Sequence, residues 1–596
     1  MTYPVPPLRL LSTMILAFLA HSLVAQPDSI TLNDIIQRHW EFRLQESPLF
    51  ATSVGVHAYD DQLPDASPAA IQRRTAYQRE LLQQLTRLDR ASLSEDALIN
   101  YEYLRFILED DTAQAASRAY LVPIDAEGGF HTGLMMGLQR MRLLTTKDYE
   151  QYLVRLEAIG TYTDQHIALM RLGLTQGIVS PRLVARNAHA TIGPYITATA
   201  EDHLLYEPFT AFPARVAPAE RSRLQQAAQQ VIQSVVVPAM QRLQAFMTDT
   251  YIPQAPEAIG VSARPGGKEF YAQRVRYFTT LPLTPDEVYA RGQQEVARIQ
   301  TAMQAIVDSL DFDGSFADFL AFLRTDEQFY ADSPEALLRE ASFLAKSIDG
   351  KLPDLFNRLP RLPYGVEPVP AAIAPTYTSG RYVSGSADNH RAGTYWVNTY
   401  QLENRPLYAL PALTLHEAVP GHHLQISLAQ EMEGVPAFRQ HAYLSAYGEG
   451  WGLYSESLGE EMNIYTDLYQ QFGRLTYEMW RACRLVVDVG IHAKGWTREQ
   501  AVAYMADRTA LSKHEVNTEI DRYIGWPGQA VSYKIGELKI KELRQRAEKA
   551  LGEAFDIRAF HDVVLENGAV PLFVLEQQIE QYIEANHQQS ANSAKE

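Results

Sequence analysis

The chain has 596 residues, of which 46% are apolar and 21% are charged. This composition is that of a globular protein, with material for two or three ordinary domains or for one large helical body around a cleft. Acidic residues outnumber basic ones by 71 to 53, which argues against a general binder of nucleic acids or of anionic membranes.

The first 25 residues differ from the rest of the chain. Arg9 is their only charged residue, and the apolar run LLSTMILAFLA precedes SLVAQP. This pattern predicts a secretory signal peptide over residues 1–25, and hence a periplasmic or secreted protein with no stable membrane insertion after cleavage. An uncleaved membrane anchor is the alternative, but the apolar run is shorter than the ~20 residues that span a bilayer. The segment contains no cysteine, so it is not a lipoprotein signal; the only cysteine, Cys483, is expected to be a small buried apolar residue.

Residues 26–359 are expected to form an N-terminal helical region. Thr31 with Asp34, and Ser67 with Pro68, have the spacing of helix caps. Further amphipathic helices are expected where apolar residues recur at spacings of three and four: residues 147–174, 216–247, 284–310 and 333–356. No long polar linker separates this region from the catalytic region expected over residues 360–596, so the boundary between them is soft.

A small sheet is expected between Pro360 and Tyr400. Short runs of β-branched and aromatic residues, AIAPTYTSGRYV and GTYWVNTY, alternate there with Pro and Gly, as in strands bounded by turns. We expect a strand of this sheet to hold an extended peptide by backbone pairing, with Tyr395 and Asn398 as substrate contacts. A strand that only packs under the site is an equally open alternative.

The segment TLHEAVPGHHLQI, residues 414–426, contains the strongest candidate site. Four residues suited to metal binding or proton transfer lie within eight positions: His416, Glu417, His422 and His423. Two histidine ligands of one zinc ion must bring their nitrogens within about 3–3.5 Å of each other. The usual HExxH spacing does this on one helical face. On a straight helix His422 would lie about 9 Å, and His423 about 10.5 Å, along the axis from His416.

Pro420 and Gly421 predict how this distance is closed. Proline removes a backbone donor and clashes with the preceding turn, and glycine tolerates nearly any φ angle. We therefore expect a kink between Val419 and His422 instead of a regular helix. Such a kink can bring either His422 or His423 back to His416.

A second segment, YGEGWGLYSE over residues 447–456, is expected to be a helix with an apolar stripe on one face. Glu449 and Glu456 are seven residues apart and share another face. Glycines occupy three positions of this helix, and each costs about 1 kcal/mol relative to alanine in a helix interior. This indicates that another backbone approaches closely, as it must if two helices converge on one ion.

These two segments resemble the active-site helices of gluzincin peptidases, namely oligopeptidases and enzymes of the angiotensin-converting and dipeptidyl-peptidase types. In those helices a Gly-His pair commonly carries the second ligand, and a glutamate before glycine is the third. The resemblance implies one Zn²⁺ ion held by His416, His422 and Glu449, with His423 as the alternative to His422. Glu456 is then expected behind the ligands.

The combination with a late segment resembles a more specific group. Arg522-Tyr523, then PGQA and Tyr533, complete a set that is similar to a large bacterial family of unknown function whose members carry HExxPGHH and EGW motifs and are regarded as metallopeptidases. The resemblance covers nearly all of the mature chain. It implies a mainly α fold of the zincin or neurolysin type, with a helical body around a central cleft and a small β-sheet before the active-site helix.

The implied function is a zinc-dependent metallopeptidase that hydrolyses peptide bonds of short peptides. Glu417 is placed to accept a proton from water and pass it to the leaving amine. Tyr533, Tyr523 and Arg522 are the candidate donors to the oxyanion, and Tyr533 leads because related peptidases use a tyrosine from a late helix. A zinc amidase acting on cell-wall or other non-peptide amides, and an inactive peptide-binding protein of the same fold, are the alternatives.

Arg484, Asp488 and His492 follow one another at spacings of four, and an ion-paired helix surface explains them at least as well as a site does.

Overall fold

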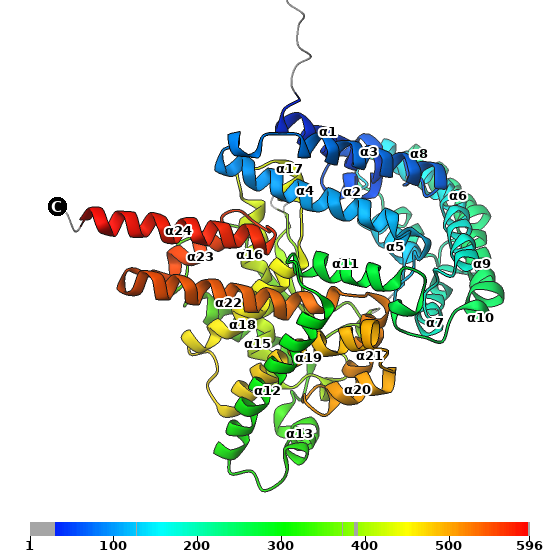
Figure 1. The fold of residues 1–596 in the computed structure, drawn as a ribbon. Coiled ribbons are helices and arrows are strands. Elements are labelled where there is room, and N and C mark those ends of the chain that lie inside the picture. Colours follow the sequence, from blue (N-terminus) through cyan, green and yellow to red (C-terminus); the bar gives the residue numbers. More distant parts are fainter. Residues whose placement is uncertain (1–29, 127, 372, 387–390, 594–596) are drawn as a thin grey trace, which may run out of the picture.

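The computed structural model describes residues 30–126, 128–371, 373–386 and 391–593. The signal peptide expected over residues 1–25 lies outside this part of the chain. The fold is mainly α, as the sequence predicts, with one small sheet among the described residues (Figure 1). No helix in the described ranges has both the length and the apolar character needed to cross a bilayer.

Helices near the N-terminus cover one end of the molecule (Figure 1). Their bounds are α1 Leu32–Glu46, α2 Pro48–Ser53, α3 Pro68–Thr86 and α4 Glu95–Ala116. The caps predicted from the sequence are present: the hydroxyl of Thr31 accepts a hydrogen bond from the backbone N–H of Asp34, and Ser67 caps α3 in the same way. These caps satisfy amide groups that the helix itself leaves unpaired.

A second group of helices has a hydrophobic core of its own, made by residues between Ile124 and Ala255. Its helices are α5 Phe130–Gln139, α6 Thr146–Gln176, α7 Arg182–Ala190, α8 Pro218–Val231, α9 Val237–Phe246 and α10 Ile252–Gln254. The predicted helix over 147–174 is α6. The one predicted over 216–247 is interrupted by a π-helical turn at Ile232–Val236.

The third group connects the two predicted regions. Its helices are α11 Gly267–Thr279, α12 Pro285–Ser309, α13 Phe316–Thr325 and α14 Pro334–Asp349. Helix α12 lies along α19, Leu468–Lys494, and a Cβ atom at Gly292 would lie 2.6 Å from the Cβ atom of Leu485. The largest hydrophobic core contains residues on both sides of residue 360, including Met303 and Val486.

The sheet has three short strands, β1 Tyr364–Pro368, β2 Gly380–Val383 and β3 Gly393–Val397. Their order is β1-β3-β2, with β1 parallel and β2 antiparallel to the central strand β3. The sequence predicts a sheet in this range. Because β3 pairs on both sides, the free edges belong to β1 and β2.

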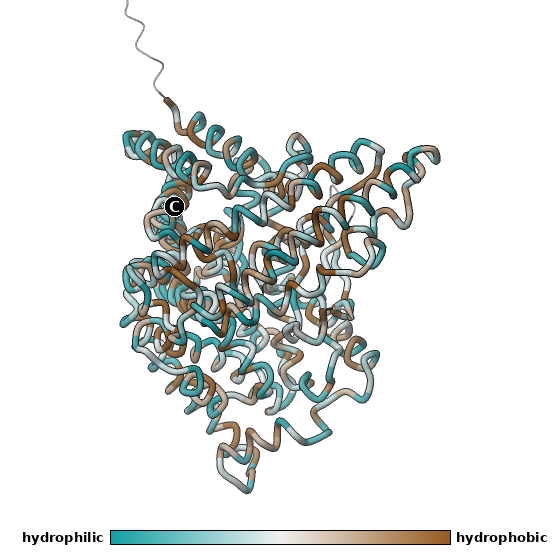
Figure 2. The backbone as a smooth tube through the Cα atoms, turned by 90° about the vertical axis from the view of Figure 1, so that its right-hand side faces the viewer, coloured by the Kyte–Doolittle hydropathy of each residue, from teal (hydrophilic) through white to brown (hydrophobic). Residues whose placement is uncertain are grey.

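The remaining helices follow the sheet. They are α15 Leu410–Glu417, α16 His422–Gln430, α17 Ala437–Gln440, α18 Ser445–Glu461, α19, α20 Arg498–Ala506, α21 Lys513–Gly525, α22 Ser532–Leu551, α23 Ile557–Leu565 and α24 Leu572–Ser593. Hydrophobic and hydrophilic residues are interspersed along the chain (Figure 2). In this region every residue of α15, and most residues of α18 and α19, are buried.

Helices α18 and α22 cross at a pair of glycines. A Cβ atom at Gly450 would lie 2.6 Å from the Cα atom of Gly536, so a side chain at either position would push the helices apart. The close backbone approach predicted from the glycines of α18 is therefore confirmed at Gly450. The other two glycines of the segment 447–456 face side chains: Gly448 faces the ring of Tyr443, and Gly452 faces that of His416.

Candidate metal centre

The chain breaks between α15 and α16 where the Pro-Gly pair predicts it. Helix α15 ends at Glu417, α16 begins at His422, and the Val419–Pro420 peptide bond is cis. Gly421 is required here because a Cβ atom would lie 1.9 Å from the carbonyl oxygen of His416. The indole Nε1 of Trp451 in α18 donates a hydrogen bond of 2.8 Å to the carbonyl of Pro420. The tryptophan of the EGW motif thus holds the turn between the two histidines.

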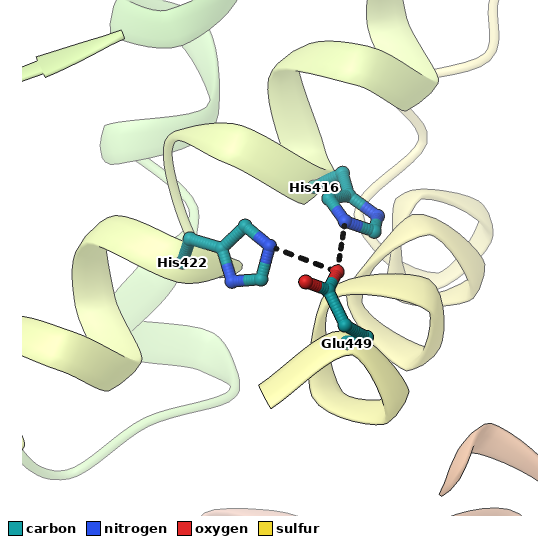
Figure 3. A group of neighbouring side chains, drawn as sticks. All are labelled: His416, His422 and Glu449. Carbon is teal, nitrogen blue, oxygen red and sulfur yellow. Dashed lines mark ion pairs between the residues drawn. The ribbon is translucent and has the colours of Figure 1, made fainter. Parts of the chain in front are cut away.

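Three side chains converge across this break (Figure 3). The Nε2 atoms of His416 and His422 lie 3.5 and 3.3 Å from Oε2 of Glu449 on α18. All three pairs of candidate ligand atoms are within 4.8 Å of one another, and these residues are the potential metal-binding group found in the described ranges. The structure therefore brings together the three ligands that the family resemblance implies.

The spacing of these atoms fits a zinc ion. With zinc–ligand bonds of about 2.0–2.1 Å, a tetrahedral site separates its ligand atoms by about 3.3 Å. The two measured distances to Glu449 are close to that value. If these three side chains held a zinc ion, one of its four coordination positions would remain for water or substrate, as in catalytic zinc sites.

Glu456 orients the first histidine, in the position expected behind the ligands. Its Oε1 atom lies 2.8 Å from Nδ1 of His416, and both side chains are buried. A carboxylate on Nδ1 holds the proton there and leaves Nε2 free to bind a metal. Gly452 makes room for the ring, because a Cβ atom there would lie 2.7 Å from Cε1 of His416.

The pKa values of the candidate ligands show where a proton is held when no metal ion is bound. Burial lowers the pKa of His416, but hydrogen bonds to Glu449 and Glu456 outweigh it and raise this pKa to about 9. Burial raises the pKa of Glu449, and the two histidines together hold it well below its usual range. The metal-free group therefore keeps a proton among its ligands, which a bound cation would displace.

His423 lies outside this group. Its Nδ1 atom is 3.0 Å from the hydroxyl of Tyr382, and its ring packs against Tyr364. Burial lowers the pKa of His423 to about 4, so the ring is neutral at pH 7. The structure favours His422 over His423 as the second ligand.

Glu417, the proposed base, is held beside the ligands by the sheet. Its Oε2 atom accepts a hydrogen bond of 2.8 Å from the backbone N–H of Tyr382 in β2. Since this N–H points to Glu417, it points away from β3. Glu417 also lines the cleft that contains the three ligands.

The cleft has a volume of about 530 Å³. The ligands and β2 form one part of its lining, and residues of α19, α21 and α22 form another, including Trp480, Arg481, Arg484, Arg522 and Tyr533. Burial, followed by the charge of Glu449, raises the pKa of Tyr533, so its hydroxyl keeps its proton and can donate.

Tyr523 does not reach the cleft. Its buried hydroxyl donates to Glu519, at 2.6 Å, and accepts hydrogen bonds from Trp480 and Arg484. It supports the cleft wall and is not free to donate to a substrate. Arg522 does line the cleft, although Glu519 and Gln529 already accept its hydrogen bonds. Of the three candidate donors, Tyr533 is the one that fits.

The two substrate contacts expected in the sheet are wrong. Tyr395 is fully buried in the central strand β3. Asn398 is also fully buried, and its Nδ2 atom donates to the carbonyls of Ala374, Tyr377 and Thr378. Both residues support the sheet from inside. The strand that lines the cleft is β2, through residues 380–382.

Arg484, Asp488 and His492 are buried, not on an ion-paired helix surface. Arg484 bonds to Tyr523 and Glu519, and Asp488 accepts from Tyr271 and from the backbone of Gly528. Burial raises the pKa of Asp488 to about 7. The spacing of four identified one face of α19 correctly, but not that other helices cover it.

Comparisons with known proteins agree with the resemblance to a large bacterial family of unknown function. Residues 48–579 match a family described as "Bacterial protein of unknown function (DUF885)". The chain belongs to this family.

Two solved structures are similar to it. A candidate lipoprotein from Colwellia psychrerythraea is 27% identical with a TM-score of 0.87, over 93% of this chain and 99% of that one. A candidate lipoprotein of unknown function from Shewanella oneidensis is 18% identical with a TM-score of 0.74, over 92% and 99% of the two chains. No curated protein matches significantly. The comparisons thus identify family and fold, while the chemistry rests on the site.

Sequence reasoning missed two neighbours of the ligands in this family member. The hydroxyl of Tyr443 donates a hydrogen bond of 2.7 Å to Oε1 of Glu449, the oxygen that does not face the histidines. Arg481 on α19 lies 3.8 Å from Glu456. Tyr443 precedes the EGW motif in a loop, where no periodicity marks it. Arg481 follows Trp480 in a helix whose sequence has the pattern of a buried structural helix.

Proposed function

We propose that this protein is a zinc-dependent metallopeptidase that hydrolyses short peptides. One observation carries the proposal: His416, His422 and Glu449 converge at a cleft, and Glu417 lies beside them in the same lining. Two neutral imidazoles and one carboxylate are a usual ligand set of catalytic zinc. Glu456 supports the first histidine in the way that outer carboxylates do in such sites.

A zinc ion in this site would polarise the scissile carbonyl and bring the pKa of a water molecule near 7. The chain supplies the proton transfers. Glu417 accepts the proton of the attacking water and delivers it to the leaving nitrogen. The backbone N–H of Tyr382 keeps the carboxylate of Glu417 directed at the site. Tyr533, whose hydroxyl remains protonated, donates to the oxygen that becomes negative.

The free edge of β2 is the proposed support for the substrate backbone. Residues of an antiparallel strand direct their N–H and C=O groups alternately to the two sides. Because Tyr382 directs its N–H to Glu417, the C=O groups of Gly380 and Tyr382 face the cleft side of the strand. An extended peptide can pair with this edge and pass the ligands, which is the mode expected of the sheet but with a different strand.

A location outside the cytoplasm fits this role. The solved relatives are described as candidate lipoproteins, and the first residues of this chain have the pattern of a signal peptide. We propose that the enzyme acts on peptides in the periplasm or outside the cell.

Glu417→Gln tests the proposal. The variant is expected to bind zinc as the wild type does and to lose peptide hydrolysis by about 10²–10⁴-fold, because the amide cannot accept the proton. Zinc content and turnover of a peptide library are measured on one preparation. Glu433→Gln, an exposed change of the same kind, is the control. Unchanged turnover in Glu417→Gln removes this residue as base, and a zinc-loaded wild type without activity on any peptide contradicts the proposal.

A further inference from the structure

Two arginines in the wall of the metal cleft have donors without partners. Arg481 and Arg484 lie one helical turn apart on α19, and their side chains are 5% and 3% exposed. Both line the cleft that contains the candidate ligands. In the part of the chain that the structure describes, Nε and Nη1 of Arg481 and Nη1 of Arg484 are buried and have no hydrogen-bond partner.

Arg481 is the less neutralised of the two. Its nearest carboxylate oxygen is Oε1 of Glu456, at 3.8 Å from Nη2, which is too long for a hydrogen bond. That same oxygen already pairs with Nδ1 of His416. The charge of Glu515 also acts with Arg481, but this carboxylate accepts a hydrogen bond from Ser379.

Arg484 has more hydrogen-bond partners than Arg481 and lies in the same part of the cleft wall. Its Nε and Nη2 atoms donate to Tyr523 and Glu519, each at 2.8 Å. Glu519 also accepts from Arg522, so one carboxylate serves two arginines. The guanidinium groups of Arg481 and Arg484 lie 3.9 and 4.4 Å from the ring centre of Trp480. This stacking fixes both side chains before any ligand arrives.

A buried guanidinium with unused donors is costly unless an anion completes it. Arginine recognises carboxylates through paired N–H donors in a fixed fork. The other carboxylates of the lining are engaged: Glu417 and Glu449 belong to the proposed chemistry, and Glu519 is shared by two arginines. A carboxylate of the substrate can supply the missing anion.

We propose that Arg481, supported by Arg484, binds the C-terminal carboxylate of the substrate peptide. This inference rests on the proposed peptidase function and adds which end of the peptide is recognised. Oε1 of Glu456 lies 3.8 Å from Arg481 and 2.8 Å from the candidate ligand His416, so a carboxylate held by Arg481 lies within a few residues of the bond that is cut. The enzyme then removes a short fragment from the C-terminus of peptides.

Hydrolysis of matched peptides by the zinc-loaded enzyme is the first test. One peptide sequence is prepared with a free and with an amidated C-terminus, each with a free and an acetylated N-terminus. The free carboxylate is expected to raise kcat/KM by about 10- to 100-fold, the range of hydrogen bonds to a charged group, and acetylation to have little effect. Equal hydrolysis of the free and amidated forms overturns the inference and leaves the peptidase function intact.

The variant Arg481→Gln should lose most of this discrimination, measured as the ratio of kcat/KM for the free and the amidated peptide, while its zinc content stays near that of the wild type. Arg481→Lys should restore part of it, since lysine keeps the charge but not the fork. Arg361→Gln removes the same charge from an exposed position and should behave as the wild type. A discrimination that survives in folded Arg481→Gln overturns the assignment; if that variant does not fold, Arg481→Lys and the wild-type peptide pairs decide.

Calorimetry on the metal-free protein separates this inference from the peptidase proposal. The free peptide is expected to bind about 10- to 100-fold more tightly than the amidated one. If it does, and the zinc-loaded enzyme cuts no peptide, the carboxylate site stands and the peptidase proposal fails. An amidated peptide with a glutamate near its C-terminus tests whether a side-chain carboxylate is bound instead. If the glutamate increases the affinity and a free C-terminus does not, the assignment is overturned.

Discussion

The molecule contains two groups of largely buried charged residues, and they are built differently. In the first, Nζ of the fully buried Lys534 lies 2.8 Å from Glu478 and 3.1 Å from Glu295, and it also contacts Glu537. Burial lowers the pKa of Lys534, but the three carboxylates outweigh it and raise it. Every carboxylate here has a cation from the chain.

The second group is the candidate metal centre. It collects Glu417, Glu449 and Glu456 around two histidines, and the nearest arginine stays 3.8 Å from Glu456. Nδ1 of His422 and Oε2 of Glu456 are buried without a hydrogen-bond partner among the described residues. The comparison teaches that burial of charge alone does not mark a site. A site is marked by converging ligands that lack their own cation and open to a cleft.

The largest effect is expected from the ligands themselves. His422→Ala should lower zinc affinity by more than the 10- to 100-fold typical of an outer partner, because it removes one of three bonds to the ion. His423→Ala, one residue away, should keep the wild-type affinity. Zinc affinity is measured by competition with a chelating dye. Loss of zinc in His423→Ala alone would reverse the choice between the two histidines.

A change in the first group, around Lys534, should lower the stability of the fold and leave zinc binding unchanged. Lys534→Met leaves the buried carboxylates of Glu478 and Glu537, and the partly buried one of Glu295, without their shared cation. We expect it to lower the free energy of unfolding by about 3–5 kcal/mol. Urea denaturation of the metal-free protein measures this. Zinc affinity of the folded fraction should stay within about twofold of the wild type, a change of about 0.4 kcal/mol. A variant as stable as the wild type would mean that this group is not what holds α12, α19 and α22 together.

The outer partner of the metal centre gives an intermediate effect. Glu456→Gln keeps the size of the side chain but removes the charge that holds the proton on Nδ1 of His416. We expect zinc affinity to fall by about 10- to 100-fold, with Glu461→Gln, at the exposed end of the same helix, as the control. An affinity equal to that of the wild type would contradict the role of Glu456.

The smallest change, about tenfold for each pH unit, is expected from the dependence on pH. In the metal-free protein the pKa of His416 is raised to about 9, so below that pH zinc must displace a proton. Zinc affinity should rise about tenfold per pH unit between pH 7 and pH 9 and then level off. The raised pKa also means that protonation of His416 stabilises the metal-free fold below its unfolded value, and this contribution is lost as the pH rises through 9. Affinities that do not change between pH 7 and pH 9 would show that His416 is already neutral.

The sequence predicts those parts of the fold and of the site that depend on neighbouring residues in the chain. Caps such as Thr31–Asp34 act within one helix turn, and Pro420 with Gly421 breaks a helix regardless of what surrounds it. The choice of His422 and Glu449 came from a family pattern, and the structure places both at one point.

The errors concern contacts that depend on neighbours far away in the chain. Tyr395 and Asn398 have the alternation of a strand, but the pattern does not tell that β3 is central and that β2 supplies the free edge. Arg522 lines the cleft, but the next residue, Tyr523, is buried and lies outside its lining. Periodicity identifies a face and not what covers it.

The most direct test of the account is an anomalous diffraction experiment at the zinc edge on crystals grown with zinc. We predict one strong peak about 2.0–2.2 Å from Nε2 of His416, Nε2 of His422 and an oxygen of Glu449. A peak bound to His423, or no peak at the break between α15 and α16, would contradict the central claim that these three side chains form a metal site.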